Sequence, residues 1–276
     1  MSATTTLRER AALVAELGEI VRAMKNLAFA ELQRITRVLA AQAQAREAVA
    51  RALSELGIDL SVPAPDTRPI AWLVVGTERG LCGAFNARLA EELASLRRSS
   101  QRGEFLVAGR RLAELVGTAA PPLAFLPGCE GIEHIEVVLD QWTANLEAAR
   151  MRCREGWLLF TNRDGFVRER LWPAVAMPRK DGPGTAPGVL PLHYLPLPVL
   201  REVLRRQAMR LCLQAGLCAS LEQENRWRLS QMERAQDHLD QLGQGLRRRV
   251  ATLRQSDITN ELETLMSSVA FPVARP

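Results

Sequence analysis

The residues best placed for chemistry lie in a glycine-punctuated loop from Arg79 to Asn86. The loop follows an apolar run of strand length, Ile70 to Val75, and precedes an amphipathic helical stretch, which is where phosphate-binding loops occur. It lacks the Gly-Lys-Ser/Thr ending of a P-loop and the third glycine of a dinucleotide fingerprint. We therefore expect Gly80, Cys82 and Gly83 to form a tight structural turn, with nucleotide binding as the alternative.

Other catalytic patterns are missing from the sequence. It has no nucleophile elbow, no His-Glu-x-x-His and no convincing pair of carboxylates. The five cysteines include no Cys-x-x-Cys pair and the three histidines are scattered, which favours buried thiols in a reducing compartment over disulfides or a metal site. We expect no catalysis by this chain, no cofactor and no metal.

A polar group near the carboxyl end has a different character. It consists of Arg254, Gln255, Thr259 and Glu261, on a stretch with strong helical periodicity. These side chains form directional hydrogen bonds, and an arginine can hold a carboxylate through two parallel bonds. Spacing alone leaves two interpretations open, a solvated helix face and a contact with a partner.

The chain has a long segment without internal proline at each end, and the polar group lies on the second of them. Any contact with a partner must therefore be positioned by these segments. Their apolar residues recur mostly three, four or seven positions apart, which is the pattern of wound helices. In the first segment the apolar positions are Leu7, Val14, Leu17, Val21, Met24, Ala28, Leu32, Ile35 and Leu39. In the second they are Leu200, Leu204, Leu211, Cys218, Leu221, Leu229, Met232, Leu239, Leu242, Leu246, Val250 and Leu253. We expect an antiparallel coiled coil.

Between these segments the pattern changes to short apolar strands that alternate with helical stretches. Strands are expected at 70–75, 105–108 and 157–161, with helices at 86–97 and 132–151. Such alternation is typical of βαβ units and a mostly parallel sheet. The predicted fold is thus α/β plus a long antiparallel coiled coil. Its parts are an amino-terminal helix (1–57), a Rossmann-like α/β insert (68–198) and a carboxyl-terminal helix (199–276).

Composition narrows the classes of partner. The formal net charge is +5, but only 5% of residues are aromatic and the arginines are interspersed with glutamates. This favours solvated faces first, an acidic protein partner second and nucleic acid last. The apolar runs are far shorter than the roughly 20 residues that a bilayer needs, so we expect a soluble, unsecreted chain.

Three blocks of the sequence together resemble the gamma subunit of F-type ATP synthases. Ile20 to Ala28 is similar to the family's Ile-Thr-Lys-Ala-Met-x-x-Val-Ala run, and Leu73 to Asn86 to its Asp-Arg-Gly-Leu-Cys-Gly-Gly-Leu-Asn turn. In the last segment, Glu224 and Arg228 fall in register with Ser-Glu-x-x-x-Arg-Met. Arg254 to Leu262 matches Arg-Gln-x-x-Ile-Thr-x-Glu-Leu. The order, spacing and setting of the blocks agree.

The resemblance implies a non-catalytic rotor, the central stalk. Its terminal helices would enter a ring of alpha and beta subunits, and its insert would lie beside the epsilon subunit and the c-ring of the membrane sector. The rotor would couple ion translocation to ATP synthesis or hydrolysis elsewhere in the complex. It would lie at the cytoplasmic face of a bacterial inner membrane, attached only through the complex.

Residue roles are carried over by position from the same resemblance. Arg254 and Gln255, with Thr259 and Glu261 nearby, would form a polar catch on a beta subunit. Met24 and Lys25 would face an acidic lever segment of beta. Gly80, Cys82 and Gly83 would be a fold element without a ligand.

Some positions depart from the family pattern. Glu31-Leu32 replaces a Lys-Met pair, Ala251 an asparagine and Ser268 a glycine, and Arg247 to Arg249 is unusually basic. These departures indicate a divergent branch. Two rival hypotheses remain: a self-associating coiled-coil scaffold with an α/β head, and a nucleotide-binding α/β enzyme.

Overall fold

The computed structural model describes residues 3–58, 60, 67–99, 103–117, 123–173 and 193–269. By packing, the chain forms two compact units. One, here called the helical unit, comprises Met1–Leu27 and Leu229–Pro276, and the other, the α/β unit, comprises Ala28–Arg228. Two long helices, α1 (Ala3–Glu55) and α5 (Leu197–Val269), contribute to both units.

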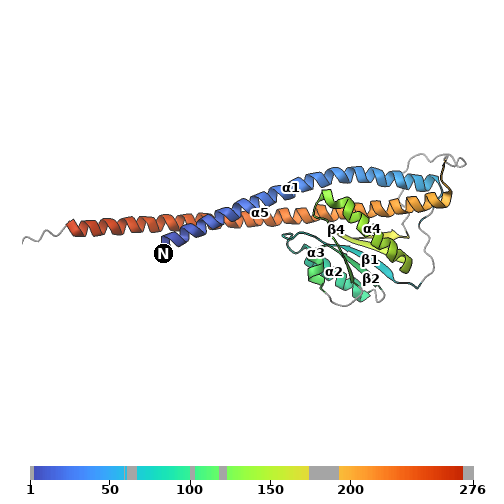
Figure 1. The fold of residues 1–276 in the computed structure, drawn as a ribbon. Helices are drawn as coiled ribbons and strands as arrows, with labels where there is room; N and C mark the ends of the chain where they lie inside the picture. The colour runs from blue at the N-terminus through green and yellow to red at the C-terminus, as the bar shows by residue number, and fades with distance from the viewer. Residues whose placement is uncertain are drawn as a thin grey trace, which may run out of the picture. The chain divides into compact units, whose positions relative to one another are not determined.

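A five-stranded sheet forms the centre of the α/β unit, in the order β3-β2-β1-β4-β5 (Figure 1). The strands are β1 (Ile70–Val75), β2 (Gly103–Ala108), β3 (Leu123–Leu126), β4 (Glu155–Asn162) and β5 (Gly165–Trp172). The helices around it are α2 (Phe85–Ser99), α3 (Arg110–Val116), the short 3-10 helix η1 (Ile132–His134) and α4 (Ile135–Arg152). All neighbours pair in parallel except β4 and β5, so the predicted mostly parallel sheet is confirmed.

Both faces of the sheet are buried, which explains why β1 is apolar throughout. Ala71, Leu73 and Val75 point into a core shared with α4 and α5, whereas Trp72 and Val74 point into a core shared with α2 and α3. This division follows from the two-residue period of a strand, since successive side chains face opposite sides. A parallel sheet covered by helices on both faces is the arrangement that continuous apolar strands favour.

The segment of α5 that covers the sheet is buried on several sides. Leu213 and Leu217 are fully buried in the same core as Ile35 of α1. Gly216 permits a close approach, because a Cβ atom there would lie 2.4 Å from Leu158 Cδ2 and 3.1 Å from Phe160 Cδ1 of β4. The missing side chain therefore sets how near α5 lies to the sheet.

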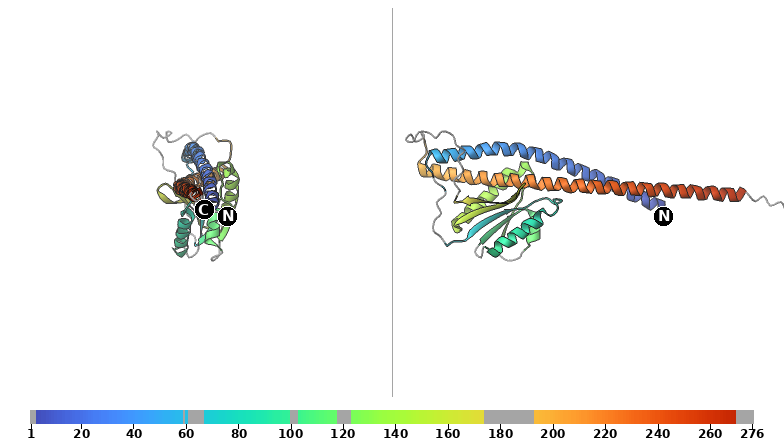
Figure 2. Two further views of the ribbon diagram at one scale, coloured as in Figure 1. Left: turned by 90° about the vertical axis from the view of Figure 1, so that its left-hand side faces the viewer. Right: turned by 180° about the vertical axis from the view of Figure 1, so that it is seen from behind.

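The helical unit pairs α1 with α5 in antiparallel orientation (Figure 2). Lys25 Nζ lies 3.4 Å from Glu233 Oε1, and farther along the pair Val14 lies opposite Gly243. Half-buried and buried positions of α5 alternate three and four residues apart, at Leu229, Met232, Gln236, Leu239, Gly243, Leu246, Val250 and Leu253. On α1 they fall at Leu7, Ala11, Val14, Gly18, Val21 and Lys25. This heptad spacing is that of a two-helix coiled coil.

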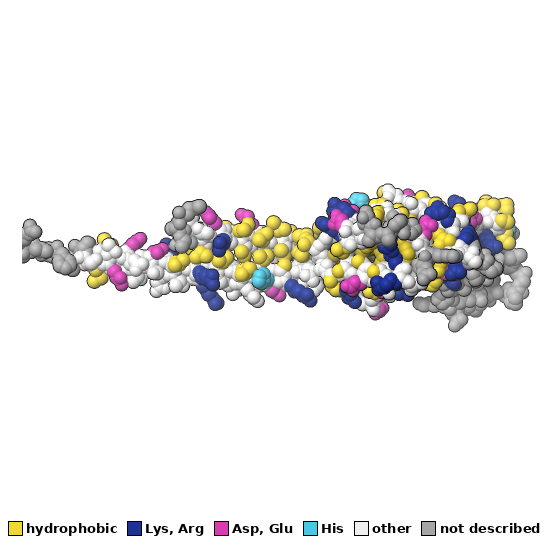
Figure 3. Space-filling view, turned by 90° about the horizontal axis from the view of Figure 1, so that it is seen from below, with side chains coloured by type: hydrophobic (Ala, Val, Ile, Leu, Met, Phe, Trp, Pro, Cys, Tyr) yellow, Lys and Arg dark blue, Asp and Glu magenta, His cyan; other side chains and the backbone are white. Residues whose placement is uncertain are grey.

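The heptad register corrects two of the seam positions expected from apolarity. Leu17 and Leu242 are exposed, whereas their neighbours Gly18 and Gly243 occupy the seam. Leu17 and Leu242, together with Leu13 and Ile20, form what we call the apolar strip. Each of these four residues is 42–57% exposed. Hydrophobic side chains reach the surface along the paired helices in the space-filling view (Figure 3).

Sequence patterns located most elements but missed three. The expected strands and helices of the insert all occur, with ends displaced by a few residues. The elements α3, β3 and β5 were not predicted. β5 lies at an edge of the sheet and contains three consecutive charged residues, Arg168, Glu169 and Arg170, which hide its apolar period. The stretch 173–198, whose many prolines and glycines predict an irregular or edge-strand region, falls mostly on residues outside the described ranges.

Two glycines of α5 should respond oppositely to alanine. We predict that Gly216→Ala destabilises the chain by about 1–3 kcal/mol, because the new methyl group overpacks a buried contact. Gly245→Ala should stabilise it by up to about 1 kcal/mol, since a Cβ atom there meets nothing within 4 Å and alanine favours the helix. Denaturant unfolding of both variants would check this, and equal shifts in one direction would contradict it.

Candidate partner-contact sites

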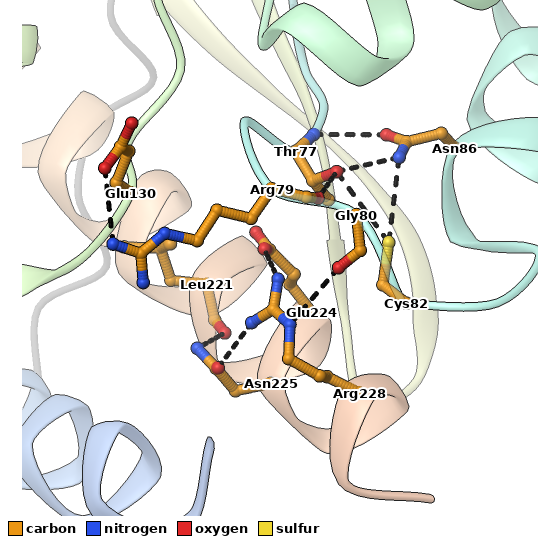
Figure 4. Close-up of polar contacts among 10 residues, drawn as sticks. All are labelled: Thr77, Arg79, Gly80, Cys82, Asn86, Glu130, Leu221, Glu224, Asn225 and Arg228. Carbon is orange, nitrogen blue, oxygen red and sulfur yellow. Dashed lines mark hydrogen bonds and ion pairs between the residues drawn. The ribbon is translucent and has the colours of Figure 1, made fainter. Parts of the chain in front are cut away.

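The glycine turn after β1 closes on itself through a small polar cluster. Asn86 Oδ1 accepts a hydrogen bond from the backbone N of Thr77 at 3.1 Å, and Asn86 Nδ2 donates to Thr77 Oγ1 at 2.7 Å. Leu81 and Gly83 have positive φ angles of 65° and 59°, and Cys82 between them is buried. The turn's geometry is thus that of a fold element (Figure 4).

Glu78, which precedes the glycine turn, connects two other loops of the α/β unit. Its Oε2 accepts hydrogen bonds from the backbone N of Arg110 at 3.0 Å and of Gly128 at 2.9 Å. Arg110 begins α3, and helix amino termini favour negative charge. The glycine turn itself leads into α2, and its polar groups Thr77 and Asn86 bond to each other, which favours the structural interpretation of the loop over a phosphate site.

A buried ion pair on α5 fastens this turn to the rest of the α/β unit. Arg228 pairs with Glu224, donates through Nη1 to Asn225 Oδ1 at 2.7 Å, and donates through Nε to Gly80 O at 3.3 Å (Figure 4). Burial raises the pKa of the Glu224 carboxyl to about 7, against the opposing effect of Arg228. Two sequence blocks about 150 residues apart therefore meet at one point.

The polar residues expected to form the catch lie on the helical unit, and three of them line one groove. Arg254, Gln255 and Thr259 contribute to an open groove of about 960 Å³ between α1 and α5. Thr259 Oγ1 donates a hydrogen bond to the backbone carbonyl of Gln255 at 2.9 Å. Glu261 is exposed on α5 but does not line the groove.

Sequence reasoning missed two members of that groove. Arg8 of α1 and Arg247 of α5 also line it, together with Ala11, Val250, Ala251 and Ile258. Arg247 was noted only for its place in a basic run. The available signal was the heptad pattern: Arg247 lies seven residues before Arg254, so both project to the same side of α5.

Met24 and Lys25, the residues expected to face the lever segment, lie on α1 of the helical unit and are both half-buried. Lys25 is engaged within the chain, since its ammonium group lies 3.4 Å from the Glu233 carboxylate. Any partner carboxylate would therefore share or replace Glu233. The structure brings Lys25 to the seam and leaves Met24 beside it.

The cysteine thiols are the remaining groups of the described residues that could react or bind a metal. All five cysteines are buried and free. Burial raises the pKa of Cys129, Cys153 and Cys212 to about 12 and that of Cys218 to about 11, so these groups remain unreactive thiols. Over the ranges that the structure describes, no group of three or more His, Cys, Asp and Glu residues is arranged to hold a metal ion. Over the same ranges, no helix has the length and apolarity of a membrane span.

One chain thus builds an α/β unit and a unit of two paired helices, which is the architecture of a coiled-coil protein with an α/β insert. The family model described as ATP synthase matches residues 3–270, so the chain belongs to the ATP synthase family.

Individual relatives agree with this assignment. The chain is 27% identical to an ATP synthase gamma chain of Beutenbergia cavernae over 91% of its own length and 92% of the relative's. It is 28% identical to an ATP synthase gamma chain of a Synechococcus species over 43% of its length and 41% of the relative's. The resemblance to gamma subunits, inferred from three sequence blocks, is confirmed.

Solved structures show the same fold. In the Euglena gracilis mitochondrial ATP synthase, a chain of the OSCP/F1/c-ring structure matches with a TM-score of 0.63 at 12% identity, over 99% of this chain and 98% of that one. A chain of the Tetrahymena thermophila central stalk and c-ring matches with a TM-score of 0.54 at 15% identity, over 78% of this chain and 99% of that one. At these identities the likeness concerns the fold.

The buried carboxyl of Glu224 should make stability depend on pH in a distinctive direction. The folded-state pKa of Glu224, about 7, lies above the ordinary 4.5 of the unfolded chain. The stabilisation by the neutral carboxyl is therefore complete below pH 4.5 and is lost as pH rises through 7. We predict that the stability advantage of the native chain over Glu224→Gln shrinks between about pH 5 and pH 8.

Glu202 provides the control for this experiment. Hydrogen bonds from Arg205 lower its pKa to about 2, so its stabilisation is present above the ordinary 4.5 and is lost only as pH falls toward 2. The difference between the native chain and Glu202→Gln should therefore stay level from about pH 5 to pH 8. Denaturant unfolding across this range measures both, and a level curve for Glu224→Gln would refute the prediction.

Proposed function

We propose that this chain is the central-stalk rotor subunit of an F-type ATPase, which couples ion translocation through the membrane sector to ATP synthesis or hydrolysis at the alpha/beta ring. The observation that carries the proposal is the antiparallel heptad pairing of α1 and α5 in a chain whose family match spans residues 3–270. The subunit is non-catalytic. Nucleotide chemistry belongs to the ring.

The physical task of such a subunit is to transmit torque. An antiparallel pair with continuous heptads resists unwinding, because turning one helix relative to the other would expose the seam residues. The surface of the pair is also uneven: a groove lined by arginines occupies part of it, and the apolar strip another part. Rotation of an uneven surface presents different chemistry in turn to each subunit of a surrounding ring.

The partners follow from the family. They are the alpha and beta subunits, the epsilon subunit and the c-ring, and the solved complexes that contain the structural relatives also include a c-ring. We assign Arg254 and Gln255, supported by Thr259 and Glu261, to the catch on a beta subunit. Met24 and Lys25 are assigned to its lever segment. Exposure of the catch residues and the polar lining of their groove support the first assignment.

The two rival functions have less support. A self-associating scaffold does not account for a gamma-chain relative matched over 92% of its length. A nucleotide-binding enzyme would need an anion site at the glycine turn, whereas the polar groups of that turn, Thr77 and Asn86, bond to each other.

The chain is part of the peripheral F1 sector on the membrane, and its curated relatives are bacterial. We place it on the cytoplasmic face of the inner membrane, attached only through the complex. This placement puts nucleotide chemistry in the compartment that holds the adenine nucleotides.

A single substitution tests the catch. We predict that Arg254→Ala lowers ATP turnover of the assembled complex by about tenfold, the scale for loss of one strong charge-assisted interaction. Ion pumping into vesicles should fall with it, while thermal unfolding of the chain stays unchanged, because Arg254 is exposed.

The matched control for this test is Arg248→Ala. Arg248 has the same charge and is also exposed on α5, but it does not line the groove. Turnover and pumping should be unaffected in that variant. Equal activity of the Arg254→Ala complex and the native complex would rule out the catch assignment.

A further inference from the structure

Three guanidinium groups surround the groove of the helical unit and come from both of its helices. Arg8 lies in the first turns of α1, and Arg247 and Arg254 lie two turns apart on α5. The lining contains no Asp or Glu. The groove therefore carries three positive charges without an internal counter-charge in its wall.

These arginines differ from many others in the chain. Arg205 and Arg210, for example, each hold two carboxylates. Among the residues that the structure describes, Arg8, Arg247 and Arg254 have no hydrogen-bond or ion-pair partner. Their donors are available to an external acceptor.

The charges work against the packing beneath them. At this level the seam consists of residues that are only half-buried: Leu7, Ala11, Val250 and Leu253. Arg8 on one helix and the two arginines on the other repel across this thin apolar contact. An anion bound between the three arginines would attract all of them, and this attraction would replace the repulsion and draw the two helices together.

We propose that Arg8 and Arg247 complete, with Arg254, a two-helix arginine cradle that takes an acidic protein segment and thereby clasps the first turns of α1 to α5. This inference rests on the proposed function for the contact at Arg254, and it adds two contact residues, the chemistry of the partner and a coupling between binding and helix closure.

The length of the cradle suits a protein segment. Arg247 and Arg254 are seven residues apart on one helix, which corresponds to about 10.5 Å along its axis. A single carboxylate or phosphate could meet both only if the two side chains bend toward each other, which brings their like charges together. A segment with at least two carboxylates spaced to match can reach both, and a third contact would go to Arg8 across the groove.

The floor of the groove adds a second requirement. Ala11, Val250 and Ile258 provide apolar surface between the guanidinium groups. An acidic segment with an aliphatic side chain between its carboxylates would fit both features. A uniformly charged polyanion would leave this apolar surface uncovered.

Clasping makes binding and helix closure mutually dependent. If the segment binds only when α1 and α5 are together, its binding must stabilise the closed pair by the same free energy. The first turns of α1 would then be held firmly in the assembled complex and less firmly in the chain alone. Hydrogen exchange of backbone amides measures this difference directly.

The test uses the assembled complex with Arg8→Gln or Arg247→Gln, and Arg248→Gln as the matched control outside the groove. Amide exchange over residues 5–14 should be slower in the native complex than in the free chain. Each cradle variant should speed that exchange in the complex by up to about fivefold, the upper range for one exposed ion pair. Each should also lower ATP turnover, and Arg248→Gln should do neither.

Other results would overturn the proposal. If Arg254→Ala slows turnover while Arg8→Gln and Arg247→Gln behave like Arg248→Gln, the cradle is wrong and the proposed catch stands. If Arg254→Ala also has no effect, the catch fails with it. If inorganic phosphate added to the free chain protects residues 5–14 as fully as assembly does, the occupant is a free anion and the acidic segment is excluded.

Discussion

The structure depends on one helix meeting two different packing demands. In the α/β unit, α5 is buried on several sides and Gly216 lets it lie close to β4. Beyond Arg228 the same helix has a single seam with heptad spacing, as a two-stranded partner of α1. The change in burial pattern along a continuous helix allows one chain to build both a sheet-based unit and a coiled coil. The other elements are arranged around that change.

The point where the pattern changes is also where charge is buried. Arg228 is the last residue of the α/β unit, and it joins Glu224 to the glycine turn after β1. A buried ion pair contributes little net stability, but removing one partner is costly because the other charge is left without compensation. The pair therefore fixes the position of the turn more than it adds to stability. This accounts for a glycine turn that resembles a ligand loop in sequence yet is held by contacts within the chain, from Arg228 to the Gly80 carbonyl and between Thr77 and Asn86.

Sequence reasoning succeeded where one period dominated. Continuous apolar strands such as β1 and the long helices α1 and α5 were predicted because each obeys a single repeat. It failed at β5, whose charged edge positions hide its period, and at the exact seam, where Gly18 and Gly243 take positions that leucines next to them were expected to fill. Apolarity alone cannot separate seam from surface when glycine occupies the seam. The groove was half predicted: motif position identified Arg254 and Gln255, but Arg8 required knowing which turn of α1 lies opposite.

The apolar strip has a practical consequence for handling this subunit. Leu13, Leu17, Ile20 and Leu242 each expose between 42% and 57% of their surface along the helix pair. Exposed apolar surface on the free chain favours aggregation, because water is released when two such surfaces meet. Preparations of the chain by itself are therefore expected to aggregate at high concentration, and low concentrations or solubilising additives should keep it dispersed.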